Sequence, residues 1–290
     1  MKGIILAGGS GSRLHPLTLV ASKQLMPVYD KPMIYYPLST LMLMGIKDVL
    51  IISTPDDIPK FEKLLGNGHK LGMKFSFKIQ DKPNGIAEAF LIGEKFINNK
   101  PVTLILGDNL FYGHGYLDFV KEEINNFNGA LIFGYPVKNP KRYGVVEFND
   151  NGKVISIEEK PQYPKTNYAV PGLYVYDENI VSITKSIKPS KRGELEITDV
   201  NTEYLKLDKL HVKLLSRGVA WLDTGTHKSL LEAGAFIETI ETRQGLKVGC
   251  IEEIAYSEGF INEQSFKSLI ASYPKNSYTD YLASLINLKL

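Results

Sequence analysis

The sequence predicts a three-layer α/β fold: a mixed, mainly parallel sheet flanked by helices, followed by a helical C-terminal annex. Apolar, largely β-branched runs at 2–6, 49–53 and 102–106 have the length and composition of buried strands. Two helix-like stretches, 32–45 and 86–97, lie between them. Strands that alternate with helices are joined by right-handed crossovers, so these segments should form parallel strands with helices on the sheet faces.

The ends and periodicity of these segments support their assignment. Residues 32–45 are apolar almost throughout, begin with proline and end at glycine, as helices favour. Residues 73–79 alternate as a half-buried strand does, and 130–135 form another strand-like run. One face of the predicted helix 86–97 carries Ala89, Phe90, Gly93, Phe96 and Ile97.

The pattern changes after Gly144. Residues 145–148, 154–157 and 168–176 have strand patterns with little helix between them, which predicts a mixed or antiparallel extension of the sheet. The segment Asn149-Asp150-Asn151-Gly152 predicts a tight turn between the first two of these strands.

The C-terminal part is mostly helical from Thr226 onward and ends in a leucine-rich tail. The sequence contains no internal repeat, low-complexity tract or obvious flexible linker. We therefore expect residues 1–290 to form a single domain, with 1–225 as an α/β core and 226–290 as the helical annex.

Composition excludes several classes of protein. The chain has 290 residues and a formal net charge of +2, so no strong overall field draws it to nucleic acid or membrane. Its one cysteine, Cys250, rules out an internal disulfide, and its apolar setting favours a small buried hydrophobe over a reactive thiol. No apolar run approaches the roughly 20 residues that span a bilayer. The N-terminal run is too short for a signal peptide, so we expect a cytoplasmic protein.

A glycine loop follows the first strand. Gly8, Gly9 and Gly11 let backbone N–H groups crowd around phosphate oxygens, and Arg13 adds a planar fork of donors. The loop lacks the Gly-Lys-Ser/Thr of a P-loop, and leucine replaces the third glycine of the dinucleotide pattern. On this segment alone, a turn without a ligand is an equal alternative. Lys23 shifts the balance, because a triphosphate needs both an arginine and a lysine beside such a loop.

Further motifs follow in order along the chain. Those that carry the comparison are Lys23-Gln24-Leu25-Met26-Pro27, Gln80-Asp81-Lys82-Pro83-Asn84-Gly85-Ile86-Ala87, Leu106-Gly107-Asp108-Asn109, Tyr143-Gly144-Val145-Val146-Glu147, Glu158-Glu159-Lys160-Pro161, Tyr168-Ala169-Val170-Pro171-Gly172-Leu173-Tyr174, Gly193-Glu194-Leu195-Glu196-Ile197-Thr198-Asp199 and Trp221-Leu222-Asp223-Thr224-Gly225-Thr226. Together with the glycine loop, this series resembles the signature of the sugar-phosphate nucleotidyltransferases. The resemblance is closest to their short members that use dTTP.

The resemblance implies both a fold and an activity. The fold would be Rossmann-like, with residues 1–225 as the catalytic core. The enzyme would convert dTTP and α-D-glucose 1-phosphate to dTDP-glucose and pyrophosphate by in-line displacement at the α-phosphorus, the first step of dTDP-rhamnose-type deoxysugar synthesis for cell-surface polysaccharides. Its cofactor would be Mg²⁺, held by Asp108 and Asp223. The family also implies a homotetramer, in which the helix 32–45 and the leucine-rich tail could serve an interface or pack internally.

The resemblance also assigns residues to the site. The catalytic residues would be Arg13, Lys23, Asp108 and Lys160. Nucleotide binding would involve Leu6, Gly8, Gly9, Gly11, Arg13, Lys23, Gln24, Gln80, Pro83, Gly85 and Asp108. Binding of the sugar phosphate would involve Asn109, Tyr143, Gly144, Glu159, Lys160, Val170 and Tyr174.

Individual roles follow from the same resemblance. Gln80 would read the base, because an amide carries both a donor and an acceptor, and Gly85 would leave room for it. Gln24 would lie close to the base as well. Lys160 would neutralise the sugar phosphate, and Glu159 would accept hydrogen bonds from sugar hydroxyls.

Each of these roles has a structural alternative. Asp108 and Asp223 could instead be helix N-caps. Gln80 could be a polar surface residue, and Glu159 and Lys160 could form an exposed ion pair that contributes little to stability.

Two aromatic residues have alternative assignments, and two positions differ from the family pattern. Tyr174 and Trp221 could line the sugar pocket or belong to the core. Pro171 stands where a small hydroxyl residue is common, and proline lacks an N–H donor. Gly115 follows His114 where an acidic residue is more usual, near the family's regulatory nucleotide site.

Three rival functions compete with this one. A uridylyl- or cytidylyltransferase would use the same loop, and a pocket gains only about 1–3 kcal/mol from a single methyl group. A non-catalytic sugar-nucleotide sensor should have lost Arg13, Lys23 or one of the aspartates, yet all are present. A nicotinamide dehydrogenase should have a third loop glycine and an acidic residue that ends the second strand, and this sequence lacks the glycine and has no clear acidic residue there.

Overall fold

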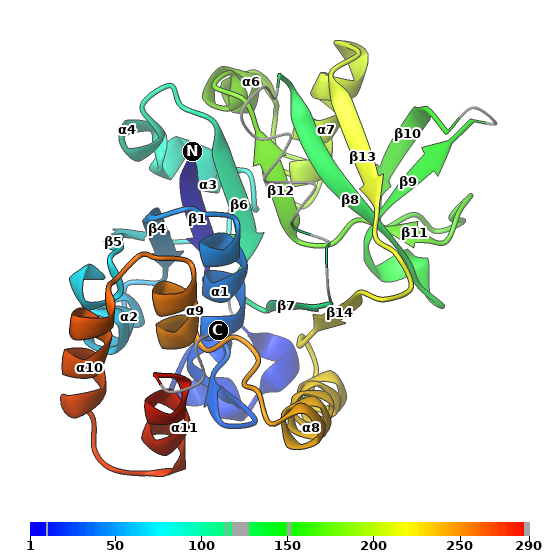
Figure 1. Ribbon diagram of the computed structural model, residues 1–290. Coiled ribbons are helices and arrows are strands. Elements are labelled where there is room, and N and C mark those ends of the chain that lie inside the picture. The colour runs from blue at the N-terminus through cyan, green and yellow to red at the C-terminus, as the bar shows by residue number, and fades with distance from the viewer. Residues whose placement is uncertain (10, 114, 116, 118–127, 150–151, 287–290) are drawn as a thin grey trace.

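A mixed sheet forms the centre of the molecule (Figure 1). The computed structural model describes residues 1–9, 11–113, 115, 117, 128–149 and 152–286. Within them, ten strands pair in the order β10-β9-β11-β8-β12-β6-β1-β4-β5, with β13 on β8. The strands are β1 Lys2–Leu6, β4 Asp48–Ser53, β5 Lys74–Ile79, β6 Val102–Leu106, β8 Ala130–Pro136, β9 Gly144–Phe148, β10 Val154–Glu159, β11 Tyr168–Ala169, β12 Leu173–Tyr176 and β13 Leu210–Leu214.

One half of the sheet is parallel, and the other is antiparallel except for β13, which pairs in parallel with β8. β1 pairs in parallel with β4 and β6, and β4 pairs in parallel with β5. Beyond β6, the strands β12, β8, β11, β9 and β10 pair in antiparallel fashion. The mainly parallel central sheet and its antiparallel extension after Gly144 are thus confirmed.

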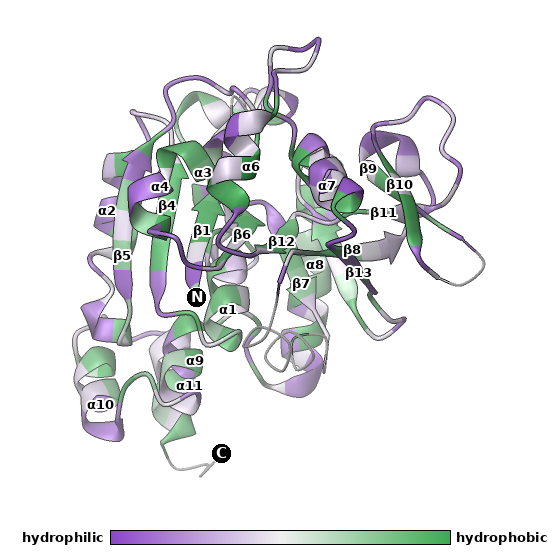
Figure 2. Ribbon diagram, turned by 90° about the horizontal axis from the view of Figure 1, so that it is seen from above, coloured by the Kyte–Doolittle hydropathy of each residue, from purple (hydrophilic) through white to green (hydrophobic). Residues whose placement is uncertain are grey.

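Helices cover both faces of this sheet. The helices are α1 Tyr35–Leu43, α2 Ile58–Leu65, α3 Glu88–Ile92, α4 Glu94–Ile97, α6 Ile180–Ser186, α7 Ile197–Lys206, α8 His227–Gln244, α9 Ile251–Ser257, α10 Glu263–Ala271 and α11 Ser277–Leu285. Because side chains alternate along a strand, Ile5 packs on one face with α1, α2, α9 and α10, whereas Ile4 and Leu6 pack on the other with α3, α4, α6 and α7. Figure 2 shows hydrophobic residues along the central strands and hydrophilic residues on the outer sides of α2, α4 and α10. This arrangement confirms the three-layer α/β fold.

The short 3₁₀ helices are η1 Ser12–Leu14, η2 Leu17–Leu19, η3 Lys23–Leu25, η4 His69–Leu71 and η6 Pro140–Arg142.

The helical C-terminal region predicted from Thr226 is confirmed by α8 to α11 (Figure 1). Thr226 caps α8: its hydroxyl accepts a hydrogen bond from the Ser229 N–H, and the Ser229 side chain accepts one from the Thr226 N–H. Cys250 is buried, as its apolar setting predicts. No helix in the described ranges is long and apolar enough to cross a membrane.

Three segment boundaries differ from the sequence prediction. The predicted strand 168–176 is interrupted at 170–172, because β11 pairs with β8 and β9 whereas β12 pairs with β6 and β8. The predicted helix 86–97 is divided at Gly93, whose backbone is not helical. A Cβ atom at this position would crowd the side chains of Ile4 and Leu50.

The third difference lies at the start of the first helix. α1 begins at Tyr35 rather than at Pro32, because Pro32 belongs to a short ribbon, β2 Pro27–Val28 with β3 Lys31–Pro32. A second ribbon, β7 Asn109–Tyr112 with β14 Ala220–Asp223, was not predicted either.

Two features named from the sequence fall partly outside the described residues. Asp150 and Asn151 of the predicted turn do so, although Asn149 and Lys153 pair on either side of it, with the Asn149 N–H 2.9 Å from the Lys153 carbonyl oxygen. His114 also lies outside them, so the regulatory site near Gly115 stays a prediction.

Candidate active site

Two adjoining cavities lie at the carboxyl ends of β1 and β6, where open α/β sheets bind ligands. The larger, here called the main cavity, has a volume of about 600 Å³. The smaller, here called the side cavity, has a volume of about 200 Å³. Gly9, Lys23 and Asp108 line both cavities, so a single ligand can extend from one into the other.

The structure brings all the predicted site residues to these cavities. The side cavity is lined by Leu6, Gly8, Gly9, Lys23, Gln24, Gln80, Pro83, Gly85 and Asp108. The main cavity is lined by Gly9, Gly11, Arg13, Lys23, Pro83, Asp108, Asn109, Tyr143, Gly144, Glu159, Lys160, Val170, Tyr174 and Asp223. The predicted nucleotide residues therefore gather mainly on one side and the predicted sugar-phosphate residues on the other.

The glycine loop has the backbone geometry that its composition predicts. Gly9 and Gly11 adopt φ values of 106° and 56°, which disfavour residues with side chains. A Cβ atom at Gly9 would meet nothing within 4 Å, so the backbone is open to a ligand. Arg13 follows the loop, and its Nη2 lies 3.0 Å from the Cβ position of Gly225, so a side chain at position 225 would crowd the guanidinium.

Asp108 is a buried carboxylate at the end of β6. Its Oδ2 pairs with the Lys23 ammonium, and its Oδ1 accepts a hydrogen bond of 2.9 Å from the Asn109 amide. Burial disfavours the charged form, but these two partners hold the pKa of Asp108 below its ordinary value. Asp108 is followed by a strand, so its alternative as a helix N-cap is wrong.

Asp223 lies more than 100 residues after Asp108 in the sequence but lines the same main cavity. It pairs with Asn109 in the β7–β14 ribbon, and Thr224 donates its hydroxyl to the Asp108 carbonyl oxygen at 3.0 Å. Burial and the nearby Asp108 carboxylate raise the pKa of Asp223, against the influence of Arg13. Since Thr226 caps α8, the N-cap alternative for Asp223 is also wrong.

These two carboxylates fit a divalent cation. Both line the main cavity, and the Asp108 carboxylate raises the pKa of Asp223, so a cation between them would relieve their repulsion. The described residues include no group of three or more His, Cys, Asp or Glu side chains set to hold a metal. A bound cation would therefore need water or ligand oxygens to complete its coordination, as Mg²⁺ does with phosphates.

Gln80 is held rigidly beside the side cavity and is only 6% exposed, so the surface alternative is wrong. Its amide nitrogen donates to the Glu88 carboxylate at 2.7 Å and to the Gly85 carbonyl oxygen at 3.3 Å. Gly85 has a φ of 110°, and a Cβ there would lie 2.3 Å from the Leu195 carbonyl oxygen. Close contact between two loops thus accounts for Gly85, whatever room it also leaves for a base.

Glu159 ends β10 and Lys160 follows it, and both line the main cavity. The Lys160 Nζ is 3.1 Å from Glu159 Oε1, and Thr198 donates its hydroxyl to Glu159 Oε2 at 2.6 Å. Lys160 has a φ of 44°, and its N–H donates to the Tyr143 carbonyl oxygen at 3.0 Å. Tertiary contacts hold this left-handed residue in place, and such conformations concentrate at functional sites.

Asn109 holds one part of the cavity wall in place. The Trp221 indole N–H donates to Asn109 Oδ1 at 2.6 Å, and the Gly172 N–H donates to the same oxygen at 3.0 Å. Tyr143 packs edge-on against Trp221 with ring centroids 5.0 Å apart. Tyr174 is buried and also lines the cavity, so its core and pocket assignments are compatible.

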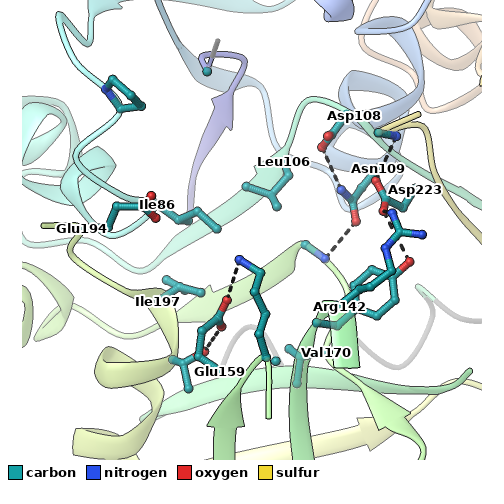
Figure 3. A pocket seen from close by; sticks show the side chains of 18 of the residues that line it. Ile86, Leu106, Asp108, Asn109, Arg142, Glu159, Val170, Glu194, Ile197 and Asp223 are labelled. Atoms are coloured by element: carbon teal, nitrogen blue, oxygen red, sulfur yellow. Dashed lines mark hydrogen bonds and ion pairs between the residues drawn. The ribbon is translucent and has the colours of Figure 1, made fainter. Parts of the chain in front are cut away.

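Several lining residues were missed in the sequence. Figure 3 shows Arg142 beside Asp223 and Glu194 on the opposite side of the cavity. Arg142 lies 3.8 Å from Asp223 Oδ2, and Arg192 lies 2.8 Å from Glu196 Oε2. Arg192 directly precedes the motif that begins at Gly193, which is the signal that could have identified it.

Comparison with known proteins assigns this chain to a family. The model of the family described as "Nucleotidyl transferase" matches residues 2–240. The chain belongs to the nucleotidyl transferase family. This nucleotidyltransferase is 53% identical over 286 residues to a glucose-1-phosphate thymidylyltransferase from Neisseria meningitidis, with 99% of each chain covered. It is 54% identical over 287 residues to the glucose-1-phosphate thymidylyltransferase of Mycolicibacterium smegmatis, again with 99% of each chain covered.

Solved structures agree with the family assignment. A crystal structure of a Bacillus anthracis protein assigned as a glucose-1-phosphate thymidylyltransferase, in complex with sucrose, has a TM-score of 0.76 and 44% identity; the match covers 81% of this nucleotidyltransferase and 94% of that chain. A UDP-glucose pyrophosphorylase with bound UDP-glucose has a TM-score of 0.73 at 24% identity, covering 82% and 98%, and shows the common fold alone.

Proposed function

We propose that this nucleotidyltransferase converts dTTP and α-D-glucose 1-phosphate to dTDP-glucose and pyrophosphate. The observation that carries the proposal is the meeting of two differently lined cavities at Lys23 and Asp108. The side cavity offers Gln80 and open glycine backbone to a nucleotide, whereas the main cavity offers Glu159 and Lys160 to a sugar phosphate. Relatives more than 50% identical over the whole chain bear the name of this reaction.

The proposed reaction needs no protein nucleophile. The second pKa of a phosphate monoester is about 6, so the sugar phosphate is already ionised at neutral pH. One of its oxygens donates an electron pair to the α-phosphorus of dTTP, and the bond from that phosphorus to the oxygen of the β-phosphate breaks. Pyrophosphate then leaves with that electron pair. The protein must align two anions that repel each other and neutralise the charge that moves.

Each basic residue has its own part in this proposal. Arg13 holds the departing β- and γ-phosphates in its planar fork of donors. Lys23 turns from Asp108 to the α-phosphate, and Lys160 neutralises the phosphate of the sugar. Asp108 and Asp223 would hold Mg²⁺, which supplies positive charge to the phosphate oxygens when bound.

The proposal is tested by pyrophosphate release. Purified protein is mixed with Mg²⁺, glucose 1-phosphate and each nucleoside triphosphate in turn. We expect dTTP to give the highest kcat/KM, UTP a lower one, and Asp108→Asn to lose about 10²–10³ in rate with its circular dichroism unchanged. The exposed Asp208→Asn serves as the matched control. A wild-type protein that releases no pyrophosphate with dTTP, or an Asp108→Asn variant with full activity, would contradict the proposal.

A further inference from the structure

The orientation of the Gln80 amide is determined by its neighbours. Its nitrogen lies 2.7 Å from the Glu88 carboxylate and 3.3 Å from the Gly85 carbonyl oxygen. Both of these partners can only accept hydrogen bonds. The reversed amide would place its oxygen against two other oxygens, which is unfavourable in a buried setting. The nitrogen of Gln80 therefore faces Glu88, and both of its hydrogens are used.

The oxygen of the same amide faces the side cavity. A Cβ atom at Gly8 would lie 3.2 Å from Gln80 Oε1, and Gly8 and Gln80 both line the side cavity. Because Gly8 has no side chain, it leaves this oxygen open to a ligand. Gln80 thus presents an acceptor, and no amide donor, to whatever occupies the side cavity.

Glu88 is itself held in the orientation that Gln80 requires. Asn84 donates its side-chain amide to Glu88 Oε1 at 2.8 Å, while Glu88 Oε2 receives the Gln80 amide. The carboxylate is thus fixed from two sides. A carboxylate differs here from an amide, because an amide at position 88 could donate as well as accept and would allow Gln80 to turn over.

We propose that Glu88 is a positioning residue that makes Gln80 an obligate acceptor and thereby selects pyrimidines that carry a hydrogen on N3. Thymine and uracil present this N–H donor, whereas cytosine presents an unprotonated N3 that would meet the Gln80 oxygen as one acceptor against another. This inference rests on the proposed function for the identity of the nucleotide. It adds the chemical basis on which cytidine nucleotides are rejected.

The test compares dUTP with dCTP, which differ only along the base edge that Gln80 would read. Binding of each nucleotide to the full chain is measured by titration calorimetry in the presence of Mg²⁺. We expect the wild-type protein to prefer dUTP, and Glu88→Gln to reduce that preference about ten- to a hundredfold, mainly by weakening dUTP. The exposed Glu94→Gln, at the start of α4, is the matched control and should leave the preference unchanged.

Other outcomes separate this role from a merely structural one. Glu88→Gln should leave the KM for glucose 1-phosphate unchanged. A variant that loses dUTP and dCTP binding equally, or that retains the wild-type preference, overturns the proposal. If Glu88→Gln does not fold, Asn84→Ala gives the same test at smaller amplitude, because it frees the carboxylate on one side.

The same titrations distinguish this inference from the proposed function. A wild-type protein that prefers dUTP in a Glu88-dependent manner but releases no pyrophosphate with glucose 1-phosphate supports the inference while the proposed reaction fails. Conversely, turnover with dTTP but equal affinity for dUTP and dCTP overturns the inference alone.

Discussion

Lys160 combines a constrained backbone with an exposed charged side chain. Its backbone is held at a φ of 44°, yet its side chain is 47% exposed, and among the residues that the structure describes it forms an ion pair only with the adjacent Glu159, at 3.1 Å. An exposed pair of this kind contributes little to stability. The fixed backbone instead aims a cation at the main cavity, where a sugar phosphate would complete its contacts.

Replacement of Lys160 should therefore separate the two substrates. We expect Lys160→Ala to raise the KM for glucose 1-phosphate at least about tenfold, since a hydrogen bond to a charged group is lost. The KM for dTTP should change much less. Steady-state pyrophosphate release with each substrate varied in turn measures both values. Lys153→Ala, an exposed lysine paired with Asp208, is the control, and equal losses for both substrates would remove Lys160 from the sugar side.

At the scale of the elements, the strands that could be predicted are those buried on both faces. β1 and β6 have continuous apolar sequences because helices cover them from both sides, and Asp108 and the glycine loop were found because they end these strands. Ribbon β7–β14 was missed because its short strands pair outside the main sheet. The interruption at 170–172 was missed because a change of strand partners leaves no mark on hydrophobic periodicity.

The site shows the same division between local pattern and tertiary pairing. Arg13, Lys23 and Lys160 belong to local motifs that can be read in sequence. Arg142 and Glu88 act on other residues through space, on Asp223 and Gln80 respectively. Their contacts depend on how segments far apart, or on different turns, are folded together, and a single sequence does not contain that information.

Helix α8 depends on its cap more than on hydrophobic packing at its start. Thr226 and Ser229 exchange hydrogen bonds at the N-terminus, and the helix begins just after Asp223. We expect Thr226→Ala to lower the free energy of unfolding by about 1 kcal/mol, as loss of an N-cap does. Urea denaturation measures this change. Thr226→Ser keeps the hydroxyl and should recover most of it, so a Ser variant as unstable as the Ala variant would rule out the capping explanation.

In the molecule as a whole, the C-terminal helices are joined to the N-terminal half by a network of charges, which is buried at Lys31 and Glu241 and more exposed at Asp30 and Lys247. Lys31 of β3 pairs with Glu241 of α8 at 2.8 Å, and Lys247 pairs with the same carboxylate at 3.3 Å. Asp30 pairs with both lysines. Burial opposes ionisation of Asp30, but the two lysines bring its pKa below the ordinary value of 3.8. Stability from Asp30 is thus present above pH 3.8 and lost as the pH falls through its folded-state pKa.

This network makes the single-domain prediction testable. Lys31→Met leaves Glu241 buried with one cation fewer, and breaking a buried pair in this way costs about 3–5 kcal/mol. If core and annex are one cooperative unit, urea unfolding of the variant followed by circular dichroism and by the fluorescence of Trp221 should give coincident curves, shifted to lower urea. The double variant Lys31→Met/Glu241→Gln should recover part of the loss, because it removes the uncompensated charge but keeps an acceptor for the Val248 N–H. Two separate transitions would instead show that residues 226–290 unfold on their own.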